Sequence, residues 1–505
     1  MERLHDTATA LQWLRSKAAA SAHLSVDSRQ VKAGDVFIAW PGAAHDGRRF
    51  AGAALTQGAA ACLMEEVGSE AFAPSLTADD ARVATLAGLK TSLGHLASQW
   101  YDQPSREMDV IAVTGTNGKT STTWWLSQAL GSAALSQPVK AGVMGTLGVG
   151  IAPQVQPTGL TTPDPVMLHR TLREFAQQGV KACAMEASSI GIEEERMAGL
   201  AIRVAVFTNF TQDHLDYHGS MAAYWQAKAR LFTWPGLQAV VLNADASETQ
   251  GLIAWLRPGV EVWTYGLHQA ARLQARSVNY TAQGMQFDVC EGGECVRLHT
   301  QAIGDFNVSN LLAVIGSLRA LGHPLAQAVK ASEGLLPVPG RLQCVGGHAQ
   351  PLVCVDYAHT PDALEKVLQT LRPVASARSG RLWCVFGCGG NRDATKRPLM
   401  GAVAERHADC VMVTSDNPRD EDAKQIICQI LRGFMNSLAA EVDVDRRSAI
   451  ASVLSQAKTE DVVLLAGKGH EDYQDIAGVK SHFSDIEEAS RALAQRIADN
   501  ERQAA

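Results

Sequence analysis

The feature that most constrains this chain is a glycine-containing loop between an apolar run and a helical run. The loop reads T-G-T-N-G-K-T at residues 114–120 and follows Val110–Val113, a run that is typical of a buried parallel strand. The segment from Ser121 to Leu130 after it favours a helix. A strand, a glycine loop and a helix in this order predict an α/β domain that holds phosphate with backbone N–H groups and the helix N-terminus.

Two side chains of this loop suit nucleotide chemistry. Lys119 would neutralise charge on the β- and γ-phosphates, and the Thr120 hydroxyl would reach Mg²⁺. The full G-x-x-x-x-G-K-[ST] pattern is not met, because Val113 stands where its first glycine would be. From this segment alone, a chance G-K-T at a strand-to-helix turn stays open as the alternative.

The remaining sequence alternates apolar runs with Ala- and Leu-rich helical stretches, which predicts α/β domains with largely parallel sheets. Prolines mark a break at Tyr101–Pro104 and another in LLPVPGR at residues 335–341. We therefore expect a small mixed α/β domain at 1–104, a central P-loop-type ATPase domain at 105–337 and a Rossmann-like domain at 338–505. The last domain should contain strands at Leu352–Val355, Leu382–Phe386, Cys410–Val413 and Val462–Leu465.

Charge and hydropathy exclude several classes of partner. The formal net charge of −7 gives no support for nucleic-acid binding, which needs a basic surface. Met1–Leu14 lacks the pattern of a signal peptide, and no run of about 18 apolar residues predicts membrane insertion. We therefore expect a cytoplasmic protein. Its ten scattered cysteines should be reduced and mostly buried, with a zinc site as the poorer alternative.

Acidic residues and histidines gather after two further apolar runs. Glu186 follows Ala182–Ala184, and T-N-F-T-Q-D-H-L-D-Y-H-G at 208–219 follows Val204–Phe207. Mg²⁺ prefers oxygen ligands, so a carboxylate at a strand end is a natural place for it. Each histidine alone could equally be a surface or hydrogen-bonded residue. Lys228, taken alone, would be a lysine on a helix surface.

Taken in order, these motifs resemble the Mur ligase family. T-G-T-N-G-K-T, M-E-x-S-S at 185–189, the D-H-L-D-Y-H-G segment and the A-K at 227–228 are joined by three later elements. These are G-D-F-N-V-S-N at 304–310, P-G-R at 339–341 and D-Y-A-H-T-P at 356–361. The resemblance spans all three expected domains and is closest to the branch that makes UDP-N-acetylmuramoyl-tripeptide.

The resemblance implies both an architecture and a reaction. The three domains would bind the UDP end of the substrate, ATP, and the incoming amino acid. ATP would phosphorylate the D-glutamate γ-carboxylate of UDP-N-acetylmuramoyl-L-alanyl-D-glutamate, and an amine would displace phosphate from that acyl phosphate. Mg²⁺ and lysine would offset charge as two anions meet. The protein is expected to be a monomer.

The family's functional positions carry over residue by residue. Lys119, Glu186, His214 and Lys228 would be catalytic, with Lys228 carbamylated to N6-carboxylysine, and Mg²⁺ would be held by Thr120, Glu186 and His214. The expected ATP-binding residues are Gly115, Thr116, Asn117, Gly118, Lys119, Thr120, Ser121, Asn307, Arg341 and Asp356. The expected contacts of the UDP-muramoyl-dipeptide are Ser28, Gly42, Ala43, Thr161, Thr162, Ser188, Glu194 and Arg196.

The incoming amino acid is indicated by D-N-P-R at residues 416–419, which is similar to the diaminopimelate-adding branch. meso-Diaminopimelate has a second carboxylate that lysine lacks, and the planar fork of Arg419 suits it. A helix-terminal salt bridge from Arg419 to Asp420 or Asp422 is the structural alternative. The expected diaminopimelate contacts are Arg392, Asp416, Asn417, Pro418, Arg419, Gly467 and Glu471.

Four residues depart from the usual pattern of this branch, namely Ala43, Ile190, Glu194 and Asn391. Glu194 would bring negative charge near an anionic substrate, which would cost affinity unless Arg196 pairs with it. Three competing functions stay open. The first is a sister ligase, either a Mur ligase that adds lysine or D-Ala-D-Ala or a folylpolyglutamate synthetase. The others are a P-loop kinase or NTPase switch and a binding protein with an inactive nucleotide site.

Overall fold

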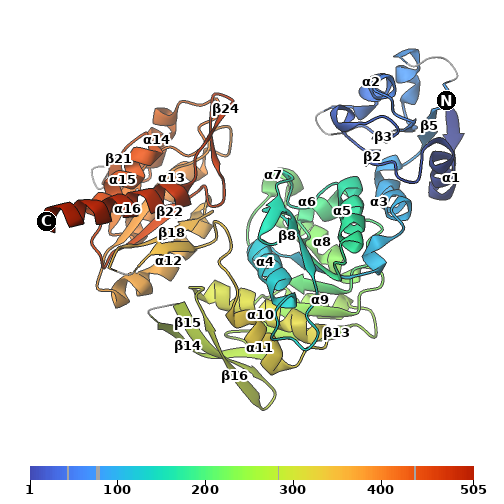
Figure 1. Ribbon diagram of the computed structural model, residues 1–505. Helices are drawn as coiled ribbons and strands as arrows, with labels where there is room; N and C mark the ends of the chain where they lie inside the picture. The colour runs from blue at the N-terminus through green and yellow to red at the C-terminus, as the bar shows by residue number, and fades with distance from the viewer. Residues whose placement is uncertain (43–44, 76–79, 282–283, 348, 437–439, 505) are drawn as a thin grey trace. The chain divides into compact units, whose positions relative to one another are not determined.

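The computed structural model describes residues 1–42, 45–75, 80–281, 284–347, 349–436 and 440–504 (Figure 1). The chain divides into two compact units. The first contains Met1–Gln274, Val289–Val296 and Ser309–Ser332. The second contains Ala275–Asp288, Arg297–Val308 and Glu333–Ala505.

The N-terminal part of the first unit is a five-stranded parallel sheet with strand order β1-β5-β4-β3-β2. Its helices begin and end as the sequence directs: Asp6 and Thr9 form a capping box that starts α1. The helix α3 ends at Trp100, ahead of Pro104. The strands are β1 (Glu2–Leu4), β2 (Leu24–Ser25), β3 (Val36–Ala39), β4 (Ala61–Glu65) and β5 (Val83–Leu86), and the helices are α1 (Thr7–Lys17), α2 (Ala51–Thr56) and α3 (Leu89–Trp100).

The central part of the first unit is built on parallel strands in the order β13-β12-β11-β6-β10-β7, followed by the antiparallel β8 and β9. Val110–Val113 in β6 are fully buried, as expected for a strand covered on both faces. The strands are β6 (Asp109–Thr114), β7 (Ala141–Gly145), β8 (Gly148–Ile151), β9 (Gln154–Gln156), β10 (Ala182–Glu186), β11 (Val204–Phe207), β12 (Ala239–Asn243) and β13 (Glu261–Gly266).

Helices accompany these strands (Figure 1). They are α4 (Lys119–Leu130), α5 (Pro165–Gln177), α6 (Ser189–Glu193), α7 (Leu215–His218), α8 (Met221–Ala229), α9 (Thr249–Trp255), α10 (Asp305–Ala320) and α11 (Leu325–Glu333). The same sheet continues through β14 (Leu273–Thr281), β15 (Gly284–Glu291) and β16 (Glu294–Thr300). The division between the two units runs through these last three strands.

The second unit contains a six-stranded sheet with strand order β17-β18-β22-β19-β20-β21, in which β17 alone is antiparallel to its neighbour. A separate apolar core lies on each face. The strands are β17 (Gln343–Gly346), β18 (Leu352–Asp356), β19 (Leu382–Phe386), β20 (Cys410–Val413), β21 (Ala440–Val442) and β22 (Val462–Ala466). The helices are α12 (Pro361–Ala377), α13 (Lys396–His407), α14 (Ala423–Leu431), α15 (Arg446–Gln456) and α16 (Asp485–Ala504), and β23 (Tyr473–Ile476) pairs with β24 (Val479–His482) as a hairpin.

The predicted α/β class and all four strands expected in the C-terminal region are confirmed. The strand, loop and helix expected around residues 110–130 are confirmed as β6 and α4. Within the described residues, no helix is long and apolar enough to cross a membrane.

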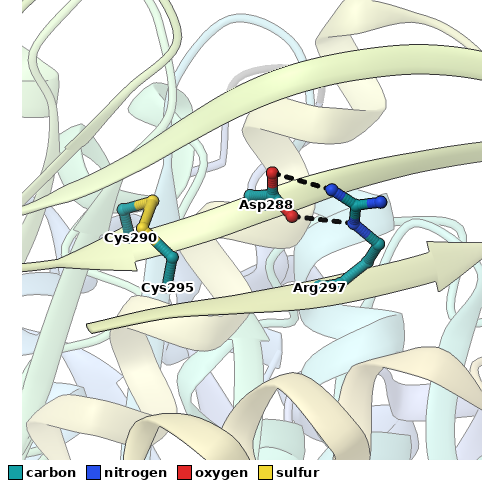
Figure 2. Close-up of a disulfide and its surroundings, with 4 residues drawn as sticks. All are labelled: Asp288, Cys290, Cys295 and Arg297. Atoms are coloured by element: carbon teal, nitrogen blue, oxygen red, sulfur yellow. Dashed lines mark hydrogen bonds and ion pairs between the residues drawn. A yellow bond between two sulfur atoms is a disulfide. The ribbon is translucent and has the colours of Figure 1, made fainter.

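The expectation that all ten cysteines are reduced is wrong for two of them. Cys290 at the end of β15 and Cys295 in β16 form a disulfide (Figure 2). The prediction failed because the sequence does not reveal that these strands form a hairpin that brings the two residues together. The other eight are free thiols, and five of them are buried. Figure 2 also shows the ion pair between Asp288 and Arg297 on the same two strands.

Candidate active site

The glycine loop between β6 and α4 is held against the segment that follows β11. The backbone N–H of Asn117 donates to Oδ1 of Asn209 at 2.9 Å, and the hydroxyl of Thr208 donates to the Asn117 carbonyl at 2.6 Å. The Thr116 hydroxyl donates to the Thr211 carbonyl at 3.0 Å and lies 3.2 Å from the Tyr224 hydroxyl. Both ends of the loop are therefore fixed before any ligand binds.

Two glycines of this loop cannot carry a side chain. Gly115 has φ +145° and Gly118 has φ +84°, a region that L-residues rarely adopt. A Cβ on Gly118 would lie 2.4 Å from Oδ1 of Asn310. A Cβ on Gly115 would collide with the Thr208 hydroxyl. The backbone at the N-terminus of α4 can therefore approach a phosphate as closely as its own atoms allow.

Two lysines meet at this loop. The Nζ atoms of Lys119 and Lys228 each donate to the Gly115 carbonyl, both at 2.8 Å. Lys228 comes from α8 and is only 1% exposed, so the prediction from the pattern alone, a lysine on a helix surface, is wrong. Lys228 lies in the last turn of α8, and its amine reaches the Gly115 carbonyl, which directly follows β6.

Burial is the main reason that the pKa of the Lys228 amine lies well below its ordinary value. The positive charge of Lys119 lowers this pKa further, and Asp213 opposes the shift. The position therefore favours an uncharged amine.

Glu186 is the last residue of β10 and is 1% exposed. Its Oε1 accepts the backbone N–H of Thr146 at 2.8 Å, and its Oε2 accepts the Thr146 hydroxyl at 3.3 Å. Within the described chain, no lysine or arginine forms an ion pair with this carboxylate. A buried carboxylate in this setting fits an oxygen-preferring cation such as Mg²⁺.

His214 lies in a strained turn after β11, with φ +52°, and its side chain is 41% exposed. Its Nε2 is 3.5 Å from Oδ2 of Asp213, and its ring lies near Tyr224. The described residues contain no cluster of three or more His, Cys, Asp or Glu side chains arranged to hold a metal. A cation at Glu186 would thus need oxygens from other sources, such as the buried Thr120 hydroxyl and water.

The residues expected to contact the muramoyl-peptide gather beside Glu186. The Thr162 hydroxyl donates to the Glu186 carbonyl at 2.8 Å and lies 3.0 Å from the Ser188 hydroxyl. The Thr161 hydroxyl lies 3.1 Å from that of Thr146. Arg196 donates to the Thr162 carbonyl at 3.1 Å. These four expected contacts therefore form one connected network with the carboxylate.

Glu194 forms an ion pair with Lys90 rather than with Arg196. Its carboxylate lies 2.6 Å from Nζ of Lys90 and accepts the Tyr217 hydroxyl. Burial tends to raise the pKa of this carboxyl, but Lys90 and Tyr217 outweigh it and hold the pKa below its ordinary value. The partner was missed because Lys90 is distant in sequence, at the start of α3.

The remaining expected contacts of the UDP end lie in the N-terminal sheet domain. Ser28 begins the short 3-10 helix Ser28–Gln30, and the N–H of Gly42 donates to the His45 carbonyl at 2.9 Å. Ala43 lies outside the described residues.

Three expected nucleotide contacts belong to the second unit. Asn307 is 4% exposed and donates to the Ile303 carbonyl at 2.9 Å. The Asp356 carboxylate accepts the N–H groups of Leu342 and Ala358, both at 2.8 Å. Burial raises the pKa of Asp356, which Arg341 and these two bonds oppose. The Arg341 guanidinium stacks on the ring of Tyr357.

The residues expected to contact diaminopimelate come from the loops after β19, β20 and β22. Asn417 Nδ2 donates to Oε2 of Glu471 at 2.8 Å. Burial, the largest effect, raises the pKa of the Glu471 carboxyl, and Asp416 adds to the shift, while Lys468 opposes it. Gly467 lies against Asp416, since an added Cβ would be 2.5 Å from that carboxylate.

Arg419 is half-buried and does not form the alternative salt bridge to Asp420 or Asp422 within the described structure. Its Nη1 donates to the Gly390 carbonyl at 2.7 Å, in the loop that also carries the exposed Arg392. The buried Pro418 precedes it. The guanidinium of Arg419 is therefore held by one hydrogen bond to a carbonyl rather than by an ion pair with either of these carboxylates.

Several residues that build the site were missed in the sequence. Thr146 holds the Glu186 carboxylate, and Tyr224 contacts both Thr116 and Lys228. Lys468 lies inside the G-K-G-H-E-D segment, and its position between two expected contacts was the available signal. Thr146 carried no such signal, because it follows β7 outside any of the motifs.

Three family models together match most of the chain. The model described as the Mur ligase family catalytic domain matches residues 21–101, that of the Mur ligase middle domain matches 113–318, and that of the Mur ligase glutamate ligase domain matches 340–469.

Relatives match over nearly the whole length. A UDP-N-acetylmuramoyl-L-alanyl-D-glutamate--2,6-diaminopimelate ligase from Acidovorax sp. (strain JS42) is 54% identical over 503 residues, covering 98% of this chain and 99% of the relative. A ligase of the same name from Pseudomonas aeruginosa is 48% identical, covering 93% and 94%.

Solved structures agree with the fold. A structure of a ligase of that same name has a TM-score of 0.67 at 36% identity and covers 94% of this chain and 95% of its own. MurF ligase from Thermotoga maritima has a TM-score of 0.66 at 18% identity, covering 95% and 99%, and this likeness concerns the fold alone.

Proposed function

This chain belongs to the Mur ligase family, and from that premise we propose that it joins meso-2,6-diaminopimelate to the D-glutamate γ-carboxyl of UDP-N-acetylmuramoyl-L-alanyl-D-glutamate. The chain is an ATP-dependent, amide-bond-forming ligase of peptidoglycan precursor synthesis. The observation that carries the proposal is its 54% identity, over 503 residues, to a ligase of this name.

The reaction needs an activated carboxylate. A carboxylate resists attack by an amine until one of its oxygens becomes a leaving group, and transfer of the γ-phosphoryl group of ATP provides it. The amine of diaminopimelate then attacks the acyl phosphate, and the tetrahedral intermediate expels phosphate. Two anions meet in the first step, so cationic groups must offset their repulsion.

We assign the phosphate end of ATP to the loop Gly115–Ser121, which includes Thr116, Asn117, Gly118 and Thr120, with Lys119 as the cation. Its N–H groups and the N-terminus of α4 favour an anion. Asn307, Arg341 and Asp356 would bind the rest of the nucleotide. Glu186, His214 and Thr120 would hold Mg²⁺, which supplies charge neutralisation for phosphoryl transfer when bound.

We propose that Lys228 carries a carbamate. An uncharged amine is the form that adds to CO₂, and burial beside Lys119 lowers the pKa of the Lys228 amine and so favours that form. The carbamate would place a negative charge next to the positive charge of Lys119. Such a pair is better suited to a buried site than two ammonium groups.

The muramoyl-dipeptide would be bound by Ser28, Gly42, Ala43, Thr161, Thr162, Ser188, Glu194 and Arg196. The network that links Thr162 and Ser188 to Glu186 supports this assignment. The Lys90 and Tyr217 contacts of Glu194 offset its negative charge and so reduce its repulsion of an anionic substrate.

Arg419 would receive the distal carboxylate of diaminopimelate, with Arg392, Asp416, Asn417, Pro418, Gly467 and Glu471 around it. Within the described residues the guanidinium makes one hydrogen bond, to the Gly390 carbonyl, and an arginine has five N–H donors. We also propose the segments 1–104, 105–337 and 338–505 as the substrate, ATP and amino-acid domains of a cytoplasmic monomer.

The test is a comparison of incoming amino acids. Purified protein with ATP, Mg²⁺ and UDP-N-acetylmuramoyl-L-alanyl-D-glutamate receives either meso-diaminopimelate or L-lysine, and both phosphate release and product mass are followed. We expect release and a mass gain with diaminopimelate alone, and the loss of both in Arg419→Ala. Activity with lysine would reject the role of Arg419 and keep the ligase. Phosphate release without any amide product would indicate a hydrolase or kinase instead.

A further inference from the structure

Two buried cations lie behind the loops that carry the candidate amino-acid contacts. We propose that Lys468 and Arg446 are positioning residues for the incoming amino acid, which brace the loop after β20 against the loop after β22. This inference rests on the proposed function, because it assumes that these loops bind diaminopimelate. Neither residue is among the contacts that the family resemblance supplied.

Lys468 links three residues around the candidate amino-acid contacts. Its side chain is fully buried. Its Nζ donates to the Tyr473 carbonyl at 2.6 Å, to Oδ1 of Asn417 at 3.2 Å and to Oε2 of Glu471 at 3.3 Å. An ammonium has three N–H donors, so these bonds use all of them. Lys468 therefore holds two candidate contacts together and has no donor left for a substrate.

Arg446 makes the second link, from the start of α15. It forms a two-point ion pair with Asp485, with both nitrogen-to-oxygen distances at 2.7 Å and both side chains fully buried. Its Nη2 also donates to the Ala466 carbonyl at 3.0 Å, and its Nη1 approaches the Ser415 carbonyl at 3.4 Å. Those carbonyls immediately precede Gly467 and Asp416, so one guanidinium spans the roots of both loops.

The hairpin β23–β24 completes the support of Arg419. The N–H of Arg419 donates to the Asp475 carbonyl at 3.0 Å, and the N–H of Ala477 donates to the Arg419 carbonyl at 2.7 Å. Arg419 has φ +51°, which a residue with a side chain holds only when its surroundings impose it. The N–H of Asp475 also donates to Oδ1 of Asn417 at 2.9 Å, so the hairpin and Lys468 meet on one amide oxygen.

The hydrogen bonds of Lys468 and Arg446 should affect the selection of diaminopimelate, because they fix the loop that carries Arg419. Recognition of a second carboxylate needs the Arg419 fork at a fixed place, and a shift of about 1 Å in a positioned group can cost about 100-fold in rate. Loss of the brace should therefore weaken the use of diaminopimelate, while the nucleotide loop in the other unit keeps its own hydrogen bonds.

The test compares Lys468→Met with a matched variant. Lys468→Met keeps the length of the side chain and removes its three donors. Arg446→Lys keeps a charge for Asp485 but cannot reach both carbonyls. Arg319→Met is the control, because it breaks a partly buried ion pair between Arg319 and Glu291 in the first unit. For each protein we would measure the melting temperature and the KM values for diaminopimelate, ATP and the UDP-linked substrate.

We expect Lys468→Met to raise the KM for diaminopimelate about 10- to 100-fold and to leave the other two KM values within about twofold. Arg446→Lys should act in the same direction. Arg319→Met should lower only the melting temperature. An unchanged KM for diaminopimelate, or an equal rise of all three KM values, would overturn the proposal.

Two further outcomes are decisive. If Lys468→Met does not fold, the KM values of Arg446→Lys test the proposal in its place. If neither variant folds, the two cations serve stability alone and the proposal is rejected. If the unmodified enzyme releases no phosphate with diaminopimelate, the proposed function fails. If the unmodified enzyme is active and both variants keep its KM for diaminopimelate, only the positioning role of Lys468 and Arg446 is rejected.

Discussion

Lys228 has an environment that makes its chemistry testable at the scale of one residue. Its amine is buried, shares the Gly115 carbonyl with Lys119 and has a pKa well below its ordinary value. We expect ¹³C-labelled bicarbonate to give a carbamate signal in the NMR spectrum of the enzyme. Lys228→Met should lack this signal and lose about 100-fold or more in kcat.

The control for this experiment is Lys366→Met, which changes an exposed lysine on α12 that pairs with Asp362. It should keep the signal and the activity. A fully active enzyme without a carbamate signal would contradict the proposed modification.

The sequence motifs indicate candidate residues for the site, whereas they do not indicate how deeply each side chain is buried. The motifs indicate Glu186 and Lys119, but nothing in A-A-Y-W-Q-A-K-A-R indicates which face of α8 is buried. Burial of a lysine depends on a neighbouring element far away in sequence. The partner of Glu194 was missed for the same reason, because Lys90 lies in the expected N-terminal domain, far from Glu194 in sequence.

At the scale of elements, the turn into α4 should tolerate no side chain at Gly118. Gly118→Ala places a Cβ 2.4 Å from Oδ1 of Asn310, at φ +84°. We expect the affinity for ATP, measured by calorimetry, to fall at least about 10-fold, and the free energy of unfolding to fall by about 1 kcal/mol. Gly179→Ala is the matched control, since it also has positive φ, at +76°, but nothing within 4 Å. Equal ATP binding in both variants would contradict the role given to the loop.

The helix α5 contains a buried histidine that should make stability depend on pH. His169 is fully buried, and its Nε2 lies 3.0 Å from the Ala198 carbonyl oxygen. Burial lowers the pKa of His169 from 6.5 to about 4. Between these values the unfolded chain binds a proton that the folded chain does not, so stability is full above pH 6.5 and falls as the pH drops toward 4.

The contribution of His169 is about 3 kcal/mol when the whole window is crossed. We expect His169→Gln, which cannot titrate, to show a smaller loss of unfolding free energy between pH 7 and pH 4 in urea titrations. An identical pH dependence in both proteins would contradict the assignment.

Strand positions were predicted well because each central strand is covered on both faces and so is a continuous apolar run. Val204–Phe207 and Leu382–Phe386 coincide with β11 and β19. The hairpin of β15 and β16 was not predicted, since β15 mixes buried with half-buried residues and β16 is mostly exposed, so neither is a continuous apolar run. Its disulfide was missed with it.

At the scale of the whole molecule, we expect the C-terminal segment to fold when it is expressed alone. The segment 338–505 has a complete six-stranded sheet with an apolar core on each face. Expressed alone, it should unfold cooperatively on heating and should not hydrolyse ATP, because it lacks the loop at 114–120. A non-cooperative transition would show that Ala275–Asp288 or Arg297–Val308 is needed for its core.

The most direct test of the reaction follows oxygen atoms. UDP-N-acetylmuramoyl-L-alanyl-D-glutamate labelled with ¹⁸O in its γ-carboxylate is incubated with the enzyme, ATP, Mg²⁺ and meso-diaminopimelate, and the masses of both products are determined. An acyl phosphate pathway predicts that one ¹⁸O moves to phosphate, while the other stays in an amide whose mass includes diaminopimelate less one water. Unlabelled phosphate, with no gain of diaminopimelate, would contradict this mechanism.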